Sequence, residues 1–462
     1  MIETRNIEQS ELVYLLGAEE DHFFDLKGRD IQPSKLQETF VAFANADGGD
    51  IYVGIEDAEY KGERVRPFET KEHANAILAV LLEQTSPSVE NVSVEFLSIG
   101  VGYILHISIP KSPKVHYTAS GDCYIRLNAG KHKIKGDRVT SLAYSKGSLL
   151  YERTAVSSIS VEDIIESEIL ENYMQRIGTG LAPEKFLRKQ RLLAEQNSSL
   201  KPSVACVLLF DEEPQASIDT RCAVKVYRLR TTETEYKREN LAEMPATITG
   251  PVEAVIISAI KKVKELVDGS SFYEGDSLVK LQYPAEAIKE VLVNAVLHRD
   301  YSLNDDIHVK IFDNRLEISS PGKLPGYMSV ANIYEERFSR NPNLVRMLHN
   351  LPNPLNHDIG EGLDTVKNEL RKAGLVDPDF EERGNTFVVT MRHQRIASIE
   401  DVILSYLDKN PDAVITNKIA RSLSGEDDIN KVKKALQKLR SDGKIALVDE
   451  RATAFNYQYK KV

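Results

Sequence analysis

The sequence has few cysteines and no long apolar run. Cys123, Cys206 and Cys222 are the only cysteines among 462 residues, which excludes a thiolate metal site and is typical of a reducing compartment. The longest apolar runs, such as VACVLLF, have the length of a strand, far below the roughly 18 residues of a membrane span. The start, MIETRNIEQSELVYLL, lacks the basic and apolar regions of a secretory signal. We therefore expect a cytoplasmic protein outside the membrane.

An excess of positive charge is also absent. The formal net charge is -11 at pH 7, which argues against a chain that coats nucleic acid non-specifically. Any such ligand must therefore meet local basic patches. The 42% of hydrophobic and 28% of charged residues are those of a soluble globular protein. A chain of this length is too long for one core.

The pattern of strands and helices predicts an α+β fold of several domains. Residues 1–150 carry strand and helix signals, and residues 151–271 read as a helical connector that leads into a small α/β segment. In that segment VACVLLF and CAVKVYRL are predicted as short buried strands, followed by the amphipathic helix VEAVIISAIKKVKELV. Residues 272–393 and 394–462 form two further predicted domains.

Residues 20–57 predict a strand, a helix and a second strand. Phe24 and Leu26 alternate with polar neighbours, which is typical of a half-buried strand and places Asp25 and Lys27 on one face. A helix opens at Pro33, and the glycines of NADGG stop it. The run IYVGIED then makes the next strand, with two acids at its exit.

Three acids of this stretch, Glu20, Asp25 and Asp57, are candidate ligands for Mg²⁺ or Mn²⁺. Carboxylate oxygens suit these cations, and Lys27 beside them would meet a phosphate, which is the chemistry of a metal-dependent nuclease. The alternative is that they are solvated charges at strand ends. Spacing alone favours that alternative.

The segments DLK and AFANADGGDIYVGIED resemble the core of the Schlafen/AlbA-like domain. In the RNA-cutting members of the Schlafen group, two acids separated by four residues and a third acid after the glycine-containing strand bind metal. The resemblance thus assigns Glu20 and Asp25 to the first two positions and Asp57 to the third, with Asp50 or Glu56 as alternatives. Position 25 is Asp where a Glu is usual.

A basic cluster follows in the same predicted domain, near two tyrosines. Six cations with aromatic neighbours suit phosphate contact and base stacking, although a run of charges is as often a solvated face. The GKHK inside the cluster is no P-loop, because the required spacing of glycines is missing. The candidate nucleic-acid contacts are Arg126, Lys131, Lys133, Lys135 and Arg138, with His132 among them.

The stretch PAEAIKEVLVNAVLHRDY predicts a buried helix with a polar line. Its apolar residues leave little room for a wet face, yet Glu290, Asn294 and His298 follow one another at steps of four residues. A buried polar group costs about 1 to 3 kcal/mol unless it is satisfied. The line therefore belongs either to an internal hydrogen-bond network or to a site that binds a ligand and a metal.

The sequence after this helix favours a ligand. IHVKIF and RLEISS form a predicted hairpin, PGKLPG makes a tight loop, and Gly360 and Gly362 come just before a helix. Glycines at that place let backbone N–H groups approach a phosphate at the helix N-terminus.

The order of these elements in residues 272–393 resembles the GHKL or Bergerat-type ATP-binding domain, which implies an α/β sandwich, ATP with Mg²⁺, and a homo-oligomer. The resemblance makes Glu290 the base that orients water and Asn294 the residue that holds Mg²⁺ on the phosphates. One departure is clear: Ser320 stands where the family has the Asp that reads adenine. The residues assigned to the nucleotide are Glu290, Asn294, His298, Arg299, Ser320, Gly322, Arg340, Asn341, Gly360 and Gly362.

Residues 394–462 predict three helices and a hairpin, which resembles a winged helix-turn-helix. The third helix carries Lys431, Lys434 and Lys438, which fit a DNA groove and its phosphates. Winged helices also serve as dimerisation and docking modules, so both uses remain open.

These observations lead to three hypotheses. The first is a metal-dependent nuclease for RNA or DNA under the control of a nucleotide switch, in prokaryotic defence or stress. The second is an ATP-responsive transcriptional regulator that binds DNA without cutting it. The third is an ATPase in its own right.

Overall fold

The computed structural model describes residues 2–274, 277–280, 282–356, 362–393, 399–410, 413–424, 428–449 and 457–462, without the side chains of 272–279, 405 and 409. The chain divides into two compact units. Met1–Leu370 with Pro378–Arg392 form the first, and Arg371–Asp377 with His393–Val462 form the second. The mixture of helices and sheets confirms the predicted α+β class.

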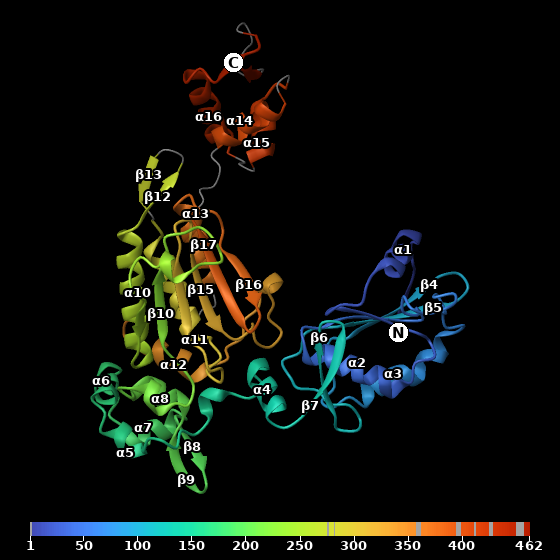
Figure 1. Cartoon of the computed structure of the whole chain (residues 1–462), viewed down its shortest axis with the longest axis horizontal. Coiled ribbons are helices and arrows are strands. Elements are labelled where there is room, and N and C mark those ends of the chain that lie inside the picture. Colours follow the sequence, from blue (N-terminus) through green and yellow to red (C-terminus); the bar gives the residue numbers. More distant parts are fainter. Residues whose placement is uncertain are drawn as a thin grey trace. The chain divides into compact units, whose positions relative to one another are not determined.

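The first unit begins with a five-stranded sheet in the amino-terminal region (residues 2–146). The strand order is β1-β4-β5-β3-β2, in which β2 runs parallel to β3 and β5 runs antiparallel to β3. Two helices, α2 and α3, pack on one face, and α1 covers part of the other (Figure 1). The elements are β1 (Glu3–Asn6), α1 (Gln9–Gly17), β2 (Phe24–Lys27), α2 (Pro33–Asn45), β3 (Gly49–Val53), α3 (Asn75–Glu83), β4 (Ser93–Ser98) and β5 (Tyr103–Ile109).

The predicted strand, helix and strand of residues 20–57 are confirmed as β2, α2 and β3. Pro33 occupies the first turn of α2, where its missing N–H costs nothing. The apolar stripe of α2, including Leu36 and Phe40, is fully buried against the sheet. Asn45 ends the helix and donates its side-chain N–H groups to the carbonyl oxygens of His116 and Tyr124. This contact fixes the next part of the chain on α2.

That next part is the hairpin of β6 (Cys123–Leu127) and β7 (Gly130–Ile134), followed by α4 (Asp137–Lys146). The hairpin packs on α2. A region of short elements then leads to the second sheet of the unit. It comprises α5 (Val161–Ile165), α6 (Glu168–Arg176), α7 (Pro183–Lys189), β8 (Leu193–Gln196), β9 (Ser199–Pro202), α8 (Val204–Phe210) and α9 (Pro214–Ser217).

The prediction of a strand at VACVLLF is wrong. These residues form α8, in which all seven side chains are buried. A helix that is apolar on every side has no period of 3.6, so its pattern cannot be told from that of a buried strand. Ser203 supplies the missing signal, since its side chain accepts the N–H of Cys206 and caps the helix.

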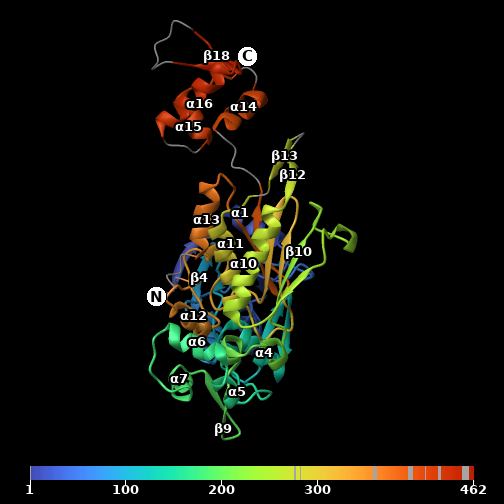
Figure 2. The same ribbon diagram turned by 90° about the vertical axis from the view of Figure 1, so that its left-hand side faces the viewer.

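The central region (residues 222–392) holds a six-stranded sheet of order β11-β10-β14-β15-β17-β16. The predicted strand at CAVKVYRL, the long helix after it and the later hairpin are confirmed as β10, α10 and β14–β15. Helices α10 and α11 pack on each other and on this sheet (Figure 2). The elements are β10 (Val224–Arg228), β11 (Ala246–Ile248), α10 (Val252–Asp268), β12 (Ser271–Glu274), β13 (Ser277–Lys280), α11 (Ala285–Leu297), β14 (Ile307–Ile311), β15 (Arg315–Pro321), α12 (Pro342–His349), α13 (Gly362–Lys372), β16 (Asp379–Arg383) and β17 (Thr386–Arg392).

In its described parts, residues 399–462 of the second unit contain three helices followed by two antiparallel strands, in the predicted order. Its core is formed by side chains from all of these elements, among them Ile403, Leu436 and Tyr459. The elements are α14 (Ile399–Lys409), α15 (Asn417–Ser424), α16 (Ile429–Ser441), β18 (Ile445–Leu447) and β19 (Tyr459–Lys461). The more specific winged-helix fold stays a prediction. None of the helices in the described parts of the chain combines the length and apolarity that a membrane crossing needs.

Candidate functional site

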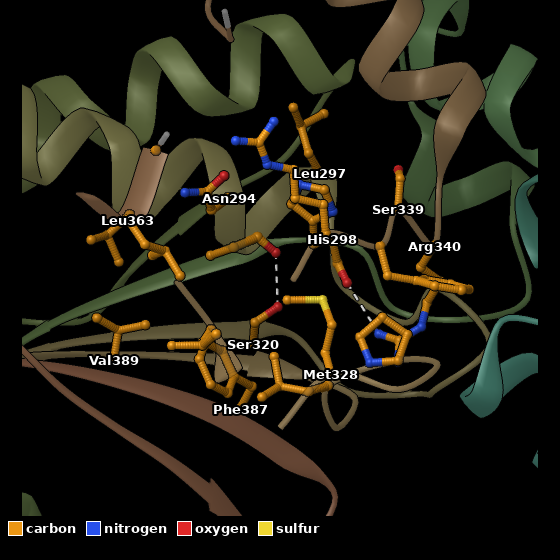
Figure 3. Close-up of a pocket in the computed structure, with 18 of the residues that line it drawn as sticks. Asn294, Leu297, His298, Ser320, Met328, Ser339, Arg340, Leu363, Phe387 and Val389 are labelled. Atoms are coloured by element: carbon orange, nitrogen blue, oxygen red, sulfur yellow. Dashed lines mark hydrogen bonds between the residues drawn. The ribbon is translucent and has the colours of Figure 1, made fainter. Parts of the chain in front are cut away.

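The central region encloses a cavity of about 360 Å³, a size that suits a small organic ligand. Its walls come from α11, from the end of β15, from the loop that follows β15, from the start of α13 and from β17 (Figure 3). The elements are therefore far apart in sequence and meet only in the folded chain. Seven of the residues predicted to contact nucleotide lie in this lining: Glu290, Asn294, His298, Ser320, Gly322, Arg340 and Gly362.

Helix α11 supplies the polar end of the cavity. Glu290 and Asn294 are one turn apart, and Glu290 is only 6% exposed. The start of α13 lies directly against them. A Cβ atom added to Gly362 would come within 2.9 Å of a Glu290 carboxylate oxygen and 3.0 Å of the Asn294 amide nitrogen. A side chain at position 362 would therefore require the ends of Glu290 and Asn294 to shift.

The opposite part of the cavity is mainly apolar. Ile318, Phe387 and Val389 come from the sheet, and Met328 comes from the loop after β15 (Figure 3). Ser320 lies among them, and its hydroxyl donates to the carbonyl oxygen of Ala295 at 2.8 Å. The hydroxyl hydrogen is thus used inside the protein. What Ser320 offers to a ligand is an acceptor oxygen without a charge.

Sequence reasoning missed this apolar half. Phe387 and Val389 sit in a strand whose alternation is the same whether its side chains pack in a core or line a cavity. Met328 lies in an irregular loop that carries no periodic signal. Only the folded structure shows that these residues line the cavity, because the loop lies over the sheet there.

Arg340 closes the end of the cavity near Gly322. It is only 2% exposed, and its guanidinium donates to the carbonyl oxygens of His298 at 3.1 Å and Lys323 at 2.7 Å. Burial lowers the pKa of Arg340 below its ordinary value. A Cβ atom on Gly322, whose φ is +106°, would lie 2.6 Å from the guanidinium. Arg340 therefore positions the chain around the cavity.

Two predicted nucleotide contacts do not line the cavity. Arg299 donates to the carbonyl oxygens of Arg221 and Asp305, and Asn341 donates to those of Leu297 and Arg299. Both side chains are 1% exposed and hold the chain that follows α11. The structure thus corrects these two assignments, because the side chains are used in internal hydrogen bonds. Gly360 lies outside the described residues.

The predicted acidic site at β2 is arranged differently from the expectation. Asp25 is only 2% exposed, and its carboxylate lies 2.7 Å from the guanidinium of Arg126. Lys27 contacts both Asp25 and Glu20, the latter at 3.0 Å. Burial raises the pKa of Glu20; in Asp25 this effect is outweighed by the hydrogen bond with Glu20 and the nearby cations, so the pKa of Asp25 is lowered. Two carboxylates are therefore balanced by two cations of the chain itself.

Asp57 does not join this cluster. Its side chain is exposed and accepts the backbone N–H of Glu59 in a turn. Among the described residues, no three His, Cys, Asp or Glu side chains are placed to hold a metal ion. The predicted cage of Glu20, Asp25 and Asp57 is thus not assembled, because Lys27 and Arg126 occupy the space around the first two carboxylates.

The predicted basic cluster is smaller than the sequence suggests. Arg126 is 1% exposed and cannot reach a ligand, Lys131 pairs with Glu38 at 3.0 Å, and Lys133 pairs with Asp122 at 2.6 Å. The assignment of Arg126 to nucleic acid is corrected on this ground. Two exposed cations stand without an ion pair in the described parts of the cluster: Lys135 and Arg138.

Helix α16 carries a more coherent basic surface. Its residues Lys431, Lys434 and Lys438 are exposed, and the helix contains no acid. Lys438 lies 3.3 Å from Glu400, a loose pair on a side chain that is 67% exposed. The opposite face, formed by Val432, Ala435, Leu436 and Leu439, is buried in the core of the second unit, as predicted.

Two family models match parts of the chain. Residues 20–135 match the model described as Schlafen, AlbA_2. Residues 304–391 match the model described as putative ATP-dependent DNA helicase recG C-terminal. The chain combines a Schlafen/AlbA-like segment with an ATPase-type segment. The resemblances seen in the sequence are confirmed to this extent, and the Schlafen/AlbA-like segment contains the acidic cluster while the ATPase-type segment contains β15, β17 and the start of α13.

Comparison with whole proteins adds little. No curated protein matches the chain. Among solved structures, the crystal structure of the DIP2311 protein from Corynebacterium diphtheriae matches at 16% identity, over 98% of this chain and 96% of that one. Its TM-score of 0.40 is too low to carry an argument.

Proposed function

We propose that this protein binds a nucleoside triphosphate with Mg²⁺ in the cavity and acts on nucleic acid under its control. One observation carries the proposal. The cavity brings the carboxylate of Glu290 and the amide of Asn294 close to Gly362 at the N-terminus of α13. An acid, an amide and a helix N-terminus are the groups that a metal-bound phosphate needs.

The polar end suits the phosphates. The backbone N–H groups at the start of a helix favour an anion, and α13 begins at Gly362. Mg²⁺ keeps several water ligands and takes one or two protein oxygens beside phosphate oxygens, so the side chains of Asn294 and Glu290 are sufficient for it. When bound, the metal neutralises phosphate charge and orients water. Glu290 is placed to hold such a water and accept its proton.

The apolar end suits a nucleobase. Phe387, Val389 and Met328 offer a face on which a flat ring can pack. Ser320 presents an uncharged acceptor where a carboxylate would read the amino group of adenine. A neutral acceptor discriminates less than a buried charge, because leaving it unpaired costs less. We expect affinities for ATP and GTP within about tenfold of each other.

Calorimetry with Mg²⁺ and ATP or GTP tests the proposal on the full chain. Asn294→Ala is expected to lower affinity at least tenfold, since it removes a metal-binding oxygen. Glu290→Gln is expected to retain binding and, if phosphate is released, to slow release about 100-fold. The control is Glu286→Gln on the same helix, whose carboxylate pairs with Lys289 outside the cavity. Absence of binding to the wild-type chain, or an unchanged affinity of Asn294→Ala, contradicts the proposal.

The nucleic-acid part is supported by the Schlafen/AlbA-like segment and by the basic surface of α16. Titrations with duplex DNA and with RNA at several salt concentrations test it, because phosphate contacts make affinity fall as salt rises. The same titrations with Mn²⁺ show whether the strand is cut. Metal-dependent cleavage, a homo-oligomer and a role in defence or stress stay predictions.

A further inference from the structure

Residues 322–326, here called the wall segment, form one side of the cavity. Gly322, Lys323, Leu324 and Pro325 all line it. The segment has little freedom on its inner side, because a Cβ atom on Gly322 would lie 2.6 Å from Arg340 and 2.7 Å from the Cβ atom of Asp300. A ligand that fills the cavity must therefore press on, or be held by, this part of the backbone.

The wall segment also contacts the amino-terminal region. The ammonium group of Lys323 lies 3.3 Å from the carboxylate of Asp47. The carbonyl oxygen of Leu324 accepts a hydrogen bond from the ammonium of Lys111 at 3.0 Å. The backbone N–H of Gly326 donates to the carbonyl oxygen of Lys146 at 3.0 Å. Lys323, Leu324 and Gly326 of this short segment thus contact Asp47, Lys111 and Lys146 of the amino-terminal region.

Asp47 is the centre of this interface. Besides Lys323 it contacts His22 at 3.0 Å and Lys111 at 3.3 Å. The hydrogen bond from His22, together with the two lysine charges, holds the pKa of Asp47 well below its usual range despite burial. The carboxylate therefore stays ionised, and Lys111 joins it to the carbonyl oxygen of the wall segment.

Two buried basic side chains extend the connection on either side. Arg340 donates to Lys323 in the wall segment and to the carbonyl oxygen of Ser145 in α4, each through the same guanidinium nitrogen. The ammonium of Lys146 donates to the carbonyl oxygen of Ala44, near the end of α2 and three residues before Asp47. The contacts are therefore continuous from the cavity to the helix that carries the Schlafen/AlbA-like core.

The interface retains space in which these contacts can change. A second cavity, of about 850 Å³, is lined by His22, Asp47 and Lys111 from one side and by Lys323 and Glu382 from the other. Lys323 lines both cavities. Its ammonium can leave Asp47 without stranding that carboxylate, because His22 and Lys111 remain.

We propose that the wall segment couples nucleotide binding to the amino-terminal region, with the Lys111 contacts to Asp47 and Leu324 as the link. The inference rests on the proposed function, since it needs a nucleotide in the cavity. Its physical basis is that one short segment is both the wall of the site and the surface that holds the other region. A ligand that shifts the conformational equilibrium of the wall segment must change these contacts. By thermodynamic linkage, a change in these contacts must then change the affinity for the ligand.

Hydrogen exchange of the full chain, with and without Mg²⁺ and the ATP analogue AMP-PNP, tests the coupling. The rate of exchange is measured in two stretches, residues 322–326 of the wall segment and residues 45–49 around Asp47. In the wild type, the ligand is expected to slow exchange about fivefold or more in both. Lys111→Met should keep the effect on residues 322–326 and lose it on residues 45–49, because Lys111 does not line the first cavity.

Lys114→Met is the matched control. Lys114 lies three residues further on, is 48% exposed and pairs with Glu90 away from the wall segment. It should behave as the wild type. Asp47→Asn, which weakens the same link from its other side, should reproduce Lys111→Met and guards against a folding defect in one variant.

Each outcome decides between the possibilities. Protection of both stretches in the wild type and the control, with loss at residues 45–49 in both link variants, supports the coupling. Protection confined to residues 322–326 in every protein overturns the coupling and leaves nucleotide binding standing, as does unchanged protection of both stretches in the link variants. No protection anywhere, with no heat of binding in calorimetry, overturns the proposed function and the coupling together.

Discussion

Glu152 shows how much a single side chain can depend on distant parts of the chain. Glu152 is 0% exposed, and its two carboxyl oxygens accept hydrogen bonds from the backbone N–H groups of Asn343 at 2.8 Å and Leu344 at 3.1 Å. It therefore satisfies two free donors at the start of α12, almost 200 residues later in the chain. Burial raises the pKa of Glu152 to about 7, although the two backbone hydrogen bonds act in the opposite direction.

The raised pKa predicts a pH dependence of stability. Between the ordinary value of 4.5 and about 7, the folded protein keeps a proton at Glu152 that the unfolded chain has released. Rising pH therefore favours unfolding in this window. Relative to Glu152→Gln, the free energy of unfolding of the wild type should fall by on the order of 3 kcal/mol between pH 4.5 and 7. Above pH 7 this group should cause no further change.

Urea unfolding at several pH values measures this difference. The control is Glu162→Gln on α5, where the side chain is exposed. A difference between wild type and Glu152→Gln that does not change with pH would contradict the assigned cause.

At the same scale, sequence reasoning brought together the candidate residues whose spacing is local. Glu290 and Asn294 follow each other on one helix face, so the period of the helix brings them together without tertiary information. The partnership of Asp25 with Arg126 joins residues 101 positions apart and leaves no periodic trace. That is why Asp25 was predicted as a metal ligand and Arg126 as a nucleic-acid contact, although each neutralises the other.

At the scale of elements, this pair fixes the β6–β7 hairpin to the sheet. The guanidinium of Arg126 reaches the carboxylate of Asp25 and the carbonyl oxygens of Asp21 and Phe24, and it lies 4.2 Å from the ring centre of Phe43. Removing the cation would leave the carboxylate of Asp25 buried beside Lys27 alone. We therefore expect Arg126→Met to destabilise the protein by about 3 to 5 kcal/mol.

Lys133→Met on the same hairpin is the comparison. Its ion pair with Asp122 is exposed, so its loss should cost less than about 1 kcal/mol. Urea denaturation followed by circular dichroism compares the two variants. Equal midpoints for both would show that the buried contacts of Arg126 do not anchor the hairpin.

Elements were predictable where their apolar pattern is one-sided. Helix α10 and strand β14 each alternate between buried and less buried positions, and both are present. Helix α8 was missed because burial on all sides erases the period. The lining from β17 and from Met328 was missed for a related reason, since a cavity and a core impose the same apolar choice.

At the scale of the whole molecule, the division into two units makes a prediction about truncation. Among the residues that the structure describes, all that line the 360 Å³ cavity precede residue 392, and the last is Val389. A chain of residues 1–392 should therefore bind nucleotide within about twofold of the full chain. Its binding to duplex DNA should weaken and become less dependent on salt, by a slope of about 2 to 3 if the three lysines of α16 contact phosphates.

Calorimetry and salt titrations of the truncated chain measure both effects. Circular dichroism must first show that the truncated chain is folded. Loss of nucleotide binding in a folded truncated chain would mean that the cavity depends on the second unit. An unchanged salt slope would remove α16 from the nucleic-acid surface.

The double use of residues 322–326 also restricts how this protein can diversify. A substitution there that improves the fit of a new ligand must at the same time preserve the ion pair of Lys323 and the hydrogen bonds of Leu324 and Gly326. Phe387 and Met328 take no part in the contacts with the amino-terminal region that are described above. Laboratory evolution toward a different ligand should therefore accumulate its accepted changes at these two positions and leave residues 322–326 untouched.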